Sequence, residues 1–179
     1  MKFIEDIKKR LGRIAIDSEI RSKHVARKTK SFADSTYIGI VYNASDDEEA
    51  KLVQEYTLQL RAQGKKVFQL GFVQEKELPF KYKFLANTEY FWLKHLKWNY
   101  LPTMESVGRF VHEEFDFLLN LYTDRVLWLE AISGLSHAQL RVGKYHPHNK
   151  LYYDLMIDTG NDHNLSFLIK QVDRYIKSV

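Results

Sequence analysis

The sequence predicts an α/β protein, a three-layer sandwich around a mostly parallel, Rossmann-like sheet of five or six strands, preceded by a basic amphipathic helix. Short β-branched and aromatic runs alternate with longer segments of helical period. Positive charge is concentrated near the N-terminus, and 179 residues are enough for one domain with a real hydrophobic core. We therefore expect residues 1–34 to form the helix and a linker, and residues 35–179 a single α/β domain.

Composition narrows the class of protein. The apolar share of 45 % and the charged share of 28 % are ordinary for a globular chain. Cysteine is absent, which excludes disulfides, thiolate-bound clusters and thiol nucleophiles. No apolar run approaches the roughly 18 residues that span a bilayer, and the N-terminus lacks the pattern of a secretory signal. We expect a cytoplasmic protein without a cofactor.

The N-terminal segment has a helical period of its own. Its apolar residues fall at helical spacing with basic residues between them, and they are Phe3, Ile4, Ile7, Leu11, Ile14 and Ala15. Beyond Ile20 the period is lost, and a densely basic, extended linker is expected. Two alternatives follow: the apolar residues Phe3, Ile7, Leu11 and Ile14 pack on the domain or on a second copy, or the helix contacts an anionic partner.

Charge is divided unevenly along the chain. Residues 1–30 carry ten basic and four acidic side chains, a net of +6, whereas the other 149 residues carry seventeen basic and nineteen acidic ones, a net of −2. A basic arm on a near-neutral body predicts RNA, the ribosome or an anionic membrane surface as partner. A homo-oligomer formed through the helix is a further alternative. The residues predicted to contact a polyanion are Lys8, Lys9, Arg10, Arg13, Arg21, Lys23, Arg27, Lys28 and Lys30.

The remaining elements follow in order. A strand at 36–43, a helix at 46–64 that ends on Gly64, and a strand at 65–73 predict a βαβ unit. The second half is expected to hold a short strand at 88–92, a helix at 103–114, an entirely apolar strand at 115–122, a helix at 124–136, strands at 138–145 and 151–158, and a closing helix at 163–179.

Ligands of such sheets bind outside the carboxyl ends of the strands, so candidate residues are sought there. Residues 46–49 are all acidic and would repel a phosphate at that helix N-terminus. No nucleotide-binding glycine loop, nucleophile elbow or metalloprotease motif occurs, and no catalytic residue is predicted. The candidate crevice residues are Asn43, Asn120, Tyr122, Tyr145 and Asp158.

The stretch 146–164 holds three histidines and three aspartates, which raises the question of a metal site. His146 and His148 flank Pro147, where extended chain should splay the imidazoles apart. His163 is expected at the opposite end of the intervening strand from His146. We therefore expect solvated histidines, a helix cap at Asn161 or Asp162, and no metal site.

Aromatic residues alternate with lysines in residues 80–102, including Phe80, Tyr82, Phe84, Phe91 and Trp98. This pattern occurs in proteins that bind single-stranded nucleic acid, where aromatic rings stack on bases. It also occurs where aromatic residues pack in the core and lysines extend outward, and we favour that alternative.

Several segments resemble a known family. FDFLLNLY, LEAISGLSHAQLRVGKY, LYYDLMID and KKVFQLGFV, with the basic N-terminal helix, resemble a family of small uncharacterised bacterial proteins known only as a domain of unknown function. The likeness covers essentially the whole chain and implies an α/β domain without an activity. FDFLLNL and LRVGKY are more distantly similar to the N-terminal half of heptosyltransferase-type glycosyltransferases. Their sugar-nucleotide site lies largely in a second domain, for which this chain has no room, so that resemblance implies a scaffold rather than a reaction.

Two functional hypotheses follow. The first is a non-enzymatic binding protein whose basic N-terminal arm contacts a polyanion. The alternative is a small enzyme, or a nucleotide- or sugar-binding protein, that uses the strand-end crevice.

Overall fold

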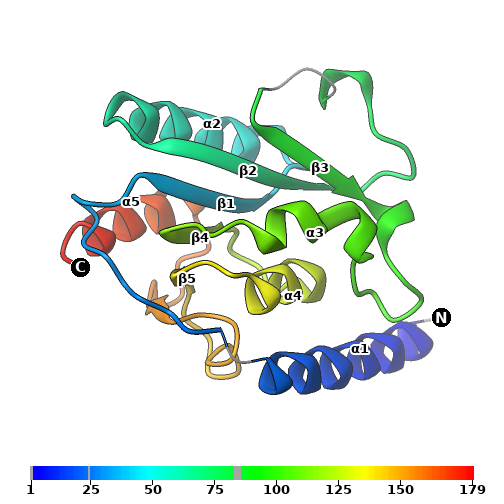
Figure 1. Ribbon diagram of the computed structural model, residues 1–179. Helices are drawn as coiled ribbons and strands as arrows, with labels where there is room; N and C mark the ends of the chain where they lie inside the picture. Colours follow the sequence, from blue (N-terminus) through cyan, green and yellow to red (C-terminus); the bar gives the residue numbers. More distant parts are fainter. Residues whose placement is uncertain (1, 24, 83–85) are drawn as a thin grey trace.

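The computed structural model describes residues 2–23, 25–82 and 86–179, and its centre is a parallel β-sheet (Figure 1). Six strands pair in the order β3-β2-β1-β4-β5-β6, and every pairing between them is parallel. They are β1 (Tyr37–Asn43), β2 (Lys66–Val73), β3 (Thr88–Trp92), β4 (Phe117–Leu121), β5 (Leu140–Lys144) and β6 (Leu155–Ile157). The order reverses between β1 and β4, as in Rossmann-like sheets. The predicted fold class is confirmed.

Helices cover both faces of the sheet (Figure 1). α2 (Asp47–Ala62) and α5 (Leu165–Ile176) share one hydrophobic core with one face. α3 (Met104–His112) and α4 (Leu127–Leu135) share a second core with the other face. α1 (Lys2–Ser22) lies outside α4, and two short 3₁₀ helices, Phe80–Tyr82 and Leu93–His95, flank β3. No helix among these residues is long and apolar enough to cross a bilayer.

The central strands are buried on both faces, which explains why they read as continuous apolar runs. All five residues of β4 are buried, and so are the five central residues of β1. Asn120 is the polar exception in β4. Its Nδ2 donates to Ser133 Oγ (3.0 Å) and to the Val142 carbonyl (2.9 Å), so the side chain ties β4 to α4 and β5.

α1 is held to the body by one of its sides. Gly12, Ile16 and Ile20 are buried, and a Cβ at position 12 would collide with the Asn99 carbonyl oxygen. The alternative in which the apolar residues of the first turns pack on the domain is wrong, because these side chains remain 43–75 % exposed: Phe3, Ile7, Leu11 and Ile14. The periodic pattern identified a helix, but it did not show which of its sides would meet the sheet layers.

Two predictions for the second half need correction. The expected strand at 151–158 is only β6, because Tyr152 and Tyr153 lie in a turn where both backbone N–H groups donate to the Asn149 carbonyl (2.9 and 3.2 Å). Both rings enter the same hydrophobic core, whereas neighbouring side chains of a strand point to opposite faces. The cap of α5 is Asn164, whose Oδ1 accepts from the backbone N–H groups of the first turn, rather than Asn161 or Asp162.

The aromatic segment at 80–102 is divided between core and surface. Tyr82 and Phe91 are buried, as core packing predicts, whereas Trp98 is 65 % exposed beside the loop that meets α1. Lys83 and Phe84 lie outside the described residues.

Candidate functional site

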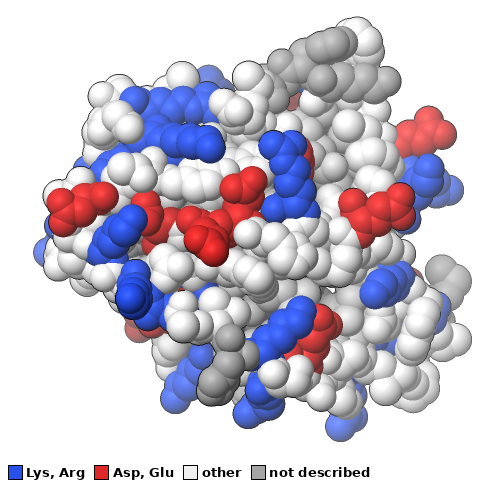
Figure 2. Space-filling model, viewed as in Figure 1, with Lys and Arg blue, Asp and Glu red and all other residues white. Residues whose placement is uncertain are grey.

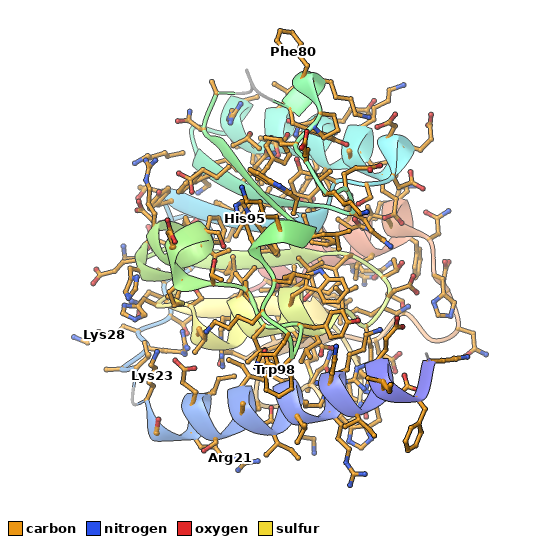
Figure 3. The ribbon with its side chains drawn as sticks, turned by 90° about the vertical axis from the view of Figure 1, so that its right-hand side faces the viewer. Arg21, Lys23, Lys28, Phe80, His95 and Trp98 are labelled. Atoms are coloured by element: carbon orange, nitrogen blue, oxygen red, sulfur yellow. The ribbon has the colours of Figure 1, made fainter. Side chains whose placement is uncertain are left out.

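The nine basic residues predicted to contact a polyanion divide into two groups. Four use their side chains in ion pairs or hydrogen bonds within the chain: Arg13 with Glu130 (2.6 Å), Lys23 with Glu19 (2.8 Å), Lys30 with Asp116 (2.8 Å) and Arg27 with the Ser136 and Ala138 carbonyls. The other five form no ion pair with any residue that the structure describes: Lys8, Lys9, Arg10, Arg21 and Lys28. Of these, Lys9 places its Nζ over the Tyr100 ring, 5.4 Å from the ring centroid. In Figure 3, Arg21 projects from the side of α1 that faces away from the body.

α1 presents an apolar stripe to the surroundings, formed by Phe3, Ile4, Ile7, Leu11 and Ile14, which are 43–75 % exposed. At 3.6 residues per turn this stripe lies opposite Gly12, Ile16 and Ile20, the side that packs on the body. The same spacing places Lys8 at one border of the stripe and Arg10 at the other. Along the lower edge of Figure 2, where α1 lies, Lys and Arg side chains project between stretches of uncharged surface, and acidic side chains lie among them higher up.

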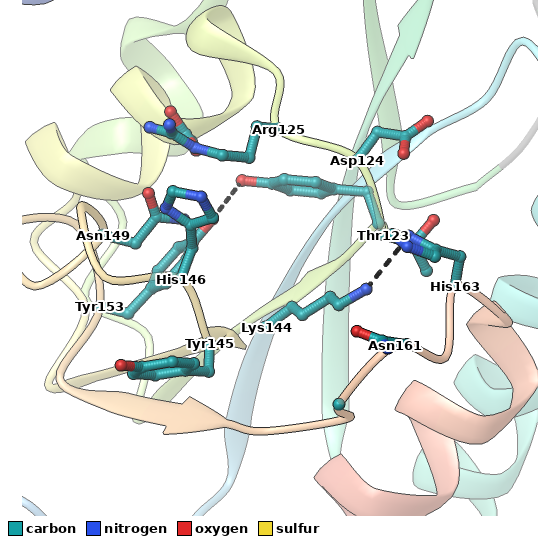
Figure 4. A pocket seen from close by; sticks show the side chains of 13 residues that line it. Thr123, Asp124, Arg125, Lys144, Tyr145, His146, Asn149, Tyr153, Asn161 and His163 are labelled. Atoms are coloured by element: carbon teal, nitrogen blue, oxygen red, sulfur yellow. Dashed lines mark hydrogen bonds and ion pairs between the residues drawn. The ribbon is translucent and has the colours of Figure 1, made fainter.

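A pocket of about 330 Å³ opens at the carboxyl ends of β4, β5 and β6, and we call it the carboxyl-edge pocket (Figure 4). The segments that follow these three strands form its walls, and Glu130 of α4 contributes from one side. Its charged and amide-bearing walls include Arg125, Lys144, His146, Asn149 and His163. This is the edge at which ligands bind in open parallel sheets.

Of the five candidate crevice residues, Tyr122 and Tyr145 line this pocket. Asn120 is 1 % exposed and is used within the sheet. Asp158 does not line the pocket, and its Oδ1 accepts from the Gly160 backbone N–H (2.8 Å) within the turn after β6.

Asn43 also lies outside the pocket, because the carboxyl end of β1 is covered. The next residue, Ala44, is fully buried, and its carbonyl accepts a hydrogen bond from the Tyr82 hydroxyl (2.7 Å). The segment after β2 thus closes the sheet at the point where the strand order reverses. The open part of the edge lies farther along, beyond β4.

Two tyrosines form the deep side of the pocket. The hydroxyls of Tyr122 and Tyr153 are hydrogen-bonded at 2.7 Å, and both side chains are buried. The Tyr153 ring packs where a Cβ on Gly143 would lie 2.6 Å from it, so this position of β5 requires glycine. Burial raises the pKa of both hydroxyls, and they are therefore neutral at physiological pH.

Glu130 connects the pocket to α1. Its side chain is 0 % exposed and accepts from Arg13 Nη2 of α1 (2.6 Å) and from Arg125 Nε (3.1 Å). The two arginines offset the buried negative charge, as a buried carboxylate requires. The wall that carries Arg125 is therefore tied to the N-terminal helix.

One buried acceptor in the pocket wall has no hydrogen-bond partner among the described residues. Asn149 is 3 % exposed, and its Oδ1 forms no hydrogen bond with any residue that the structure describes. A buried carbonyl without a donor costs about 1–3 kcal/mol of stability. An unpaired acceptor in a pocket wall is a place where a ligand donor would be stabilising.

The histidines are arranged differently from the prediction. The rings of His146 and His148 lie 5.3 Å apart rather than splayed, and His163 lines the same pocket as His146. The prediction that His163 lies at the opposite end is wrong, because residues 145–154 return the chain from the carboxyl end of β5 to the start of β6. Both histidines therefore follow the carboxyl ends of parallel strands.

The electrostatics of His146 favour a neutral ring. Burial lowers its pKa, and the nearby Arg125 and His148 lower it further. Within the described ranges no group of three or more His, Asp or Glu side chains is arranged to hold a metal ion.

Sequence reasoning missed Arg125, Lys144 and Asn149. Lys144 is the last residue of β5, and Arg125 lies in the loop after β4. The rule that ligands bind outside the carboxyl ends of the strands would have predicted both, if charged residues at these ends had been considered. Asn149 carried no such signal, because only the path of the connection at 145–154 brings it to this edge.

Comparison with curated proteins and with solved structures finds no match. The similarity to heptosyltransferase-type enzymes stays a prediction. Residues 8–179 match the model of DUF6913, a family of unknown function, and the chain belongs to this family.

Proposed function

We propose that the protein is a binding module that α1 attaches to an anionic lipid surface. The exposed apolar stripe carries this proposal, because the helix is already held to the body by its opposite side. A surface helix of a globular protein normally buries its apolar side against the core. Here the larger apolar side faces outward, which is typical of helices that lie in a membrane interface.

The apolar and the electrostatic contributions to the free energy of membrane binding are similar in size, which supports a contact that uses both. Burying the partly exposed stripe in acyl chains would contribute about 4–8 kcal/mol, at about 1.5–3 kcal/mol for each fully buried large apolar side chain. Each Lys or Arg near an anionic leaflet adds about 1 kcal/mol. Part of the total is lost to the entropy of immobilising the protein, so we expect firm binding only when both contributions are present.

Lipid accounts for more of this surface than RNA or a second copy does. RNA offers phosphates to Lys8, Arg10 and Arg21, but it offers no apolar phase to the stripe, in which Phe3 is the one aromatic residue. A second copy could cover the stripe, but the basic borders of the two helices would then approach each other. An anionic bilayer complements both the apolar and the basic groups.

The attachment of α1 to the body supports the proposal further. Ile16 and Ile20 belong to the core, and Arg13 is paired with Glu130, so the second half of the helix is ordered before any contact. A preformed helix avoids the ordering cost that a disordered peptide would meet on binding.

The test is co-sedimentation of the full chain with phosphatidylcholine vesicles, with and without phosphatidylglycerol. We expect binding to the mixed vesicles that weakens as salt is raised. Ile7→Ser combined with Ile14→Ser should reduce binding at least tenfold without unfolding the protein, because both side chains are exposed. Deleting residues 1–30 is a poor substitute, since it would also remove Ile16 and Ile20 from the core.

Matched control variants distinguish lipid binding by α1 from non-specific adsorption of the protein to vesicles. Leu58→Ser removes a similarly exposed apolar side chain, 62 % exposed, from α2 and should leave vesicle binding unchanged. Lys8→Gln with Arg10→Gln should weaken binding, whereas Lys177→Gln should not. If the Ile7 and Ile14 variant binds vesicles as well as the wild type, or if labelled RNA binds more tightly than mixed vesicles, the lipid proposal is wrong. A dimer in solution that this variant converts to a monomer would instead assign the stripe to a second copy.

A further inference from the structure

The carboxyl-edge pocket combines a small volume, fixed positive charge and an unpaired acceptor. Figure 4 shows Arg125, His146 and Asn149 on one side of it and Lys144, Asn161 and His163 on the other. Lys144 is the last residue of β5, and the others come from the segments after β4, β5 and β6, so the sheet itself holds them in place. We propose that this pocket binds a small phosphorylated polyol, whose phosphate lies near Lys144 and Arg125 and whose hydroxyl donates to Asn149 Oδ1.

The charge of the pocket favours an anion. Glu130 is offset by Arg13 and Arg125, and Asp124 also lines the pocket but is exposed to solvent. With Lys144, the three basic and two acidic side chains leave a net charge of +1 at the pocket. Lys144 Nζ donates to the Asp162 carbonyl (2.9 Å) and approaches His163 Nδ1 (3.4 Å). An ammonium has three donors, so this arrangement positions Lys144 and leaves donor capacity for a ligand. Arg125 is bonded through Nε, which leaves its terminal nitrogens for a phosphate oxygen.

Asn149 indicates the second part of the ligand. Its buried Oδ1 requires a hydrogen-bond donor, and a phosphate that has lost its protons cannot supply one. A hydroxyl on the same molecule can. The His146 imidazole and the tyrosine hydroxyls nearby add groups that both donate and accept, which suits a hydroxylated body better than an apolar one.

The volume limits the size of the ligand. About 330 Å³ is near the lower end of small-molecule pockets, which run from roughly 300 to 1,000 Å³. A monosaccharide phosphate fits this range, whereas a dinucleotide would extend beyond it. The acidic residues 46–49 at the N-terminus of α2 lie after β1, outside the pocket, so they do not line it.

Thermal unfolding of the full chain tests the proposal with three probes at matched ionic strength: ribose 5-phosphate, inorganic phosphate and ribose. Ribose 5-phosphate at roughly ten times its Kd should raise the Tm by about 3–6 °C. Inorganic phosphate should give a smaller rise, and ribose alone none, because each carries only part of the recognised chemistry.

Two variants separate the contributions. Lys144→Gln should weaken binding of ribose 5-phosphate at least tenfold, whereas Lys177→Gln, in α5's C-terminal region at the opposite edge, should leave it unchanged. Asn149→Leu should also abolish the advantage of ribose 5-phosphate over phosphate. Its own Tm should be no lower than that of the wild type, because Oδ1 forms no hydrogen bond with any described residue.

The proposal is overturned if neither phosphorylated probe raises the Tm, or if the rise survives both Lys144→Gln and Asn149→Leu. If phosphate alone matches ribose 5-phosphate and Asn149→Leu changes nothing, the polyol part is wrong. The outcome is independent of the lipid contact, because the Ile7 and Ile14 variant leaves the pocket intact and should bind the probes normally.

Discussion

The buried polar groups at the amino ends of the strands, the amino edge of the sheet, are hydrogen-bonded differently from those at the carboxyl ends, the carboxyl edge. At the amino edge, the Asp116 carboxylate accepts from Lys30 (2.8 Å) and from the Thr36 and Tyr37 backbone N–H groups (2.8 and 3.0 Å). At the carboxyl edge, Asn149 Oδ1 is left without a partner among the described residues. Saturated polar networks stabilise a fold, whereas an unpaired group is tolerated where a partner arrives from outside. We infer that the amino edge serves stability and the carboxyl edge serves contacts.

The same division separates the basic residues of the N-terminal arm. Arg27 and Lys30 lie at the amino edge and hold the chain there through the Ser136 and Ala138 carbonyls and Asp116. Lys8 and Arg10 stand in the first half of α1 and border the exposed stripe. A surplus of positive charge in the sequence therefore consists of two populations with different roles.

The largest effect is expected at the amino edge. The Arg141 guanidinium is 7 % exposed and donates to both oxygens of Asp154 (2.8 and 2.9 Å). Asp154→Ala would leave this buried cation unpaired and should cost about 3–5 kcal/mol in urea unfolding. Replacing the pair with Arg141→Met and Asp154→Leu should restore much of the loss. If Asp154→Ala lowers the free energy of unfolding no more than Asn149→Leu does, the proposed difference in stability between the two edges is wrong.

Acid should weaken the amino edge next. Burial raises the pKa of Asp116, but hydrogen bonds from Lys30 and from the Thr36 and Tyr37 N–H groups outweigh it and hold the pKa below its ordinary value. The pKa of Asp154 is also lowered, because the contacts with Arg141 outweigh burial. Groups with a lowered folded pKa stabilise fully above the unfolded value of about 3.9. Their contribution is lost as the pH falls through the lower folded pKa.

We therefore expect the urea concentration at the unfolding midpoint of the wild type to decrease when the pH is lowered below about 4. Asp116→Asn should be less stable by about 2 kcal/mol at neutral pH and should show a shallower decline in acid. An identical acid profile for variant and wild type would show that Asp116 contributes no linkage.

The smallest effect is expected where α1 packs against the body of the protein. Gly12→Ala should cost about 1–2 kcal/mol, because the added methyl meets the Asn99 carbonyl and the gain in helix propensity offsets only part of the strain. Gly108→Ala in α3 is the matched control. Its Cβ would come no closer than 3.5 Å to Met104, so this variant should be neutral or slightly stabilised. Equal stability of the two variants would mean that α1 is loosely attached.

The element order was largely predictable, and the exceptions share a cause. β1, α2 and β2 lie within two residues of their predicted bounds, because period and capping are local properties, as with Asp46 at the start of α2. The expected strand at 151–158 failed because Tyr152 and Tyr153 are apolar enough for a strand but turn together into the core. For the site, Tyr122 and Tyr145 were found by the strand-end rule, and Asn43 was not excluded because Tyr82, which covers that end, is distant in sequence.

The sequence by itself determined the class of fold, the order of its strands and helices along the chain, and the amphipathic character of α1, since these follow from spacing between near neighbours. Only the tertiary structure decided that the apolar stripe of α1 faces outward. It also decided that His146, Asn149 and His163 share one pocket, and that Arg13 is bound to Glu130 rather than free. These outcomes depend on contacts between segments that are distant in sequence, and the local sequence pattern does not determine such contacts.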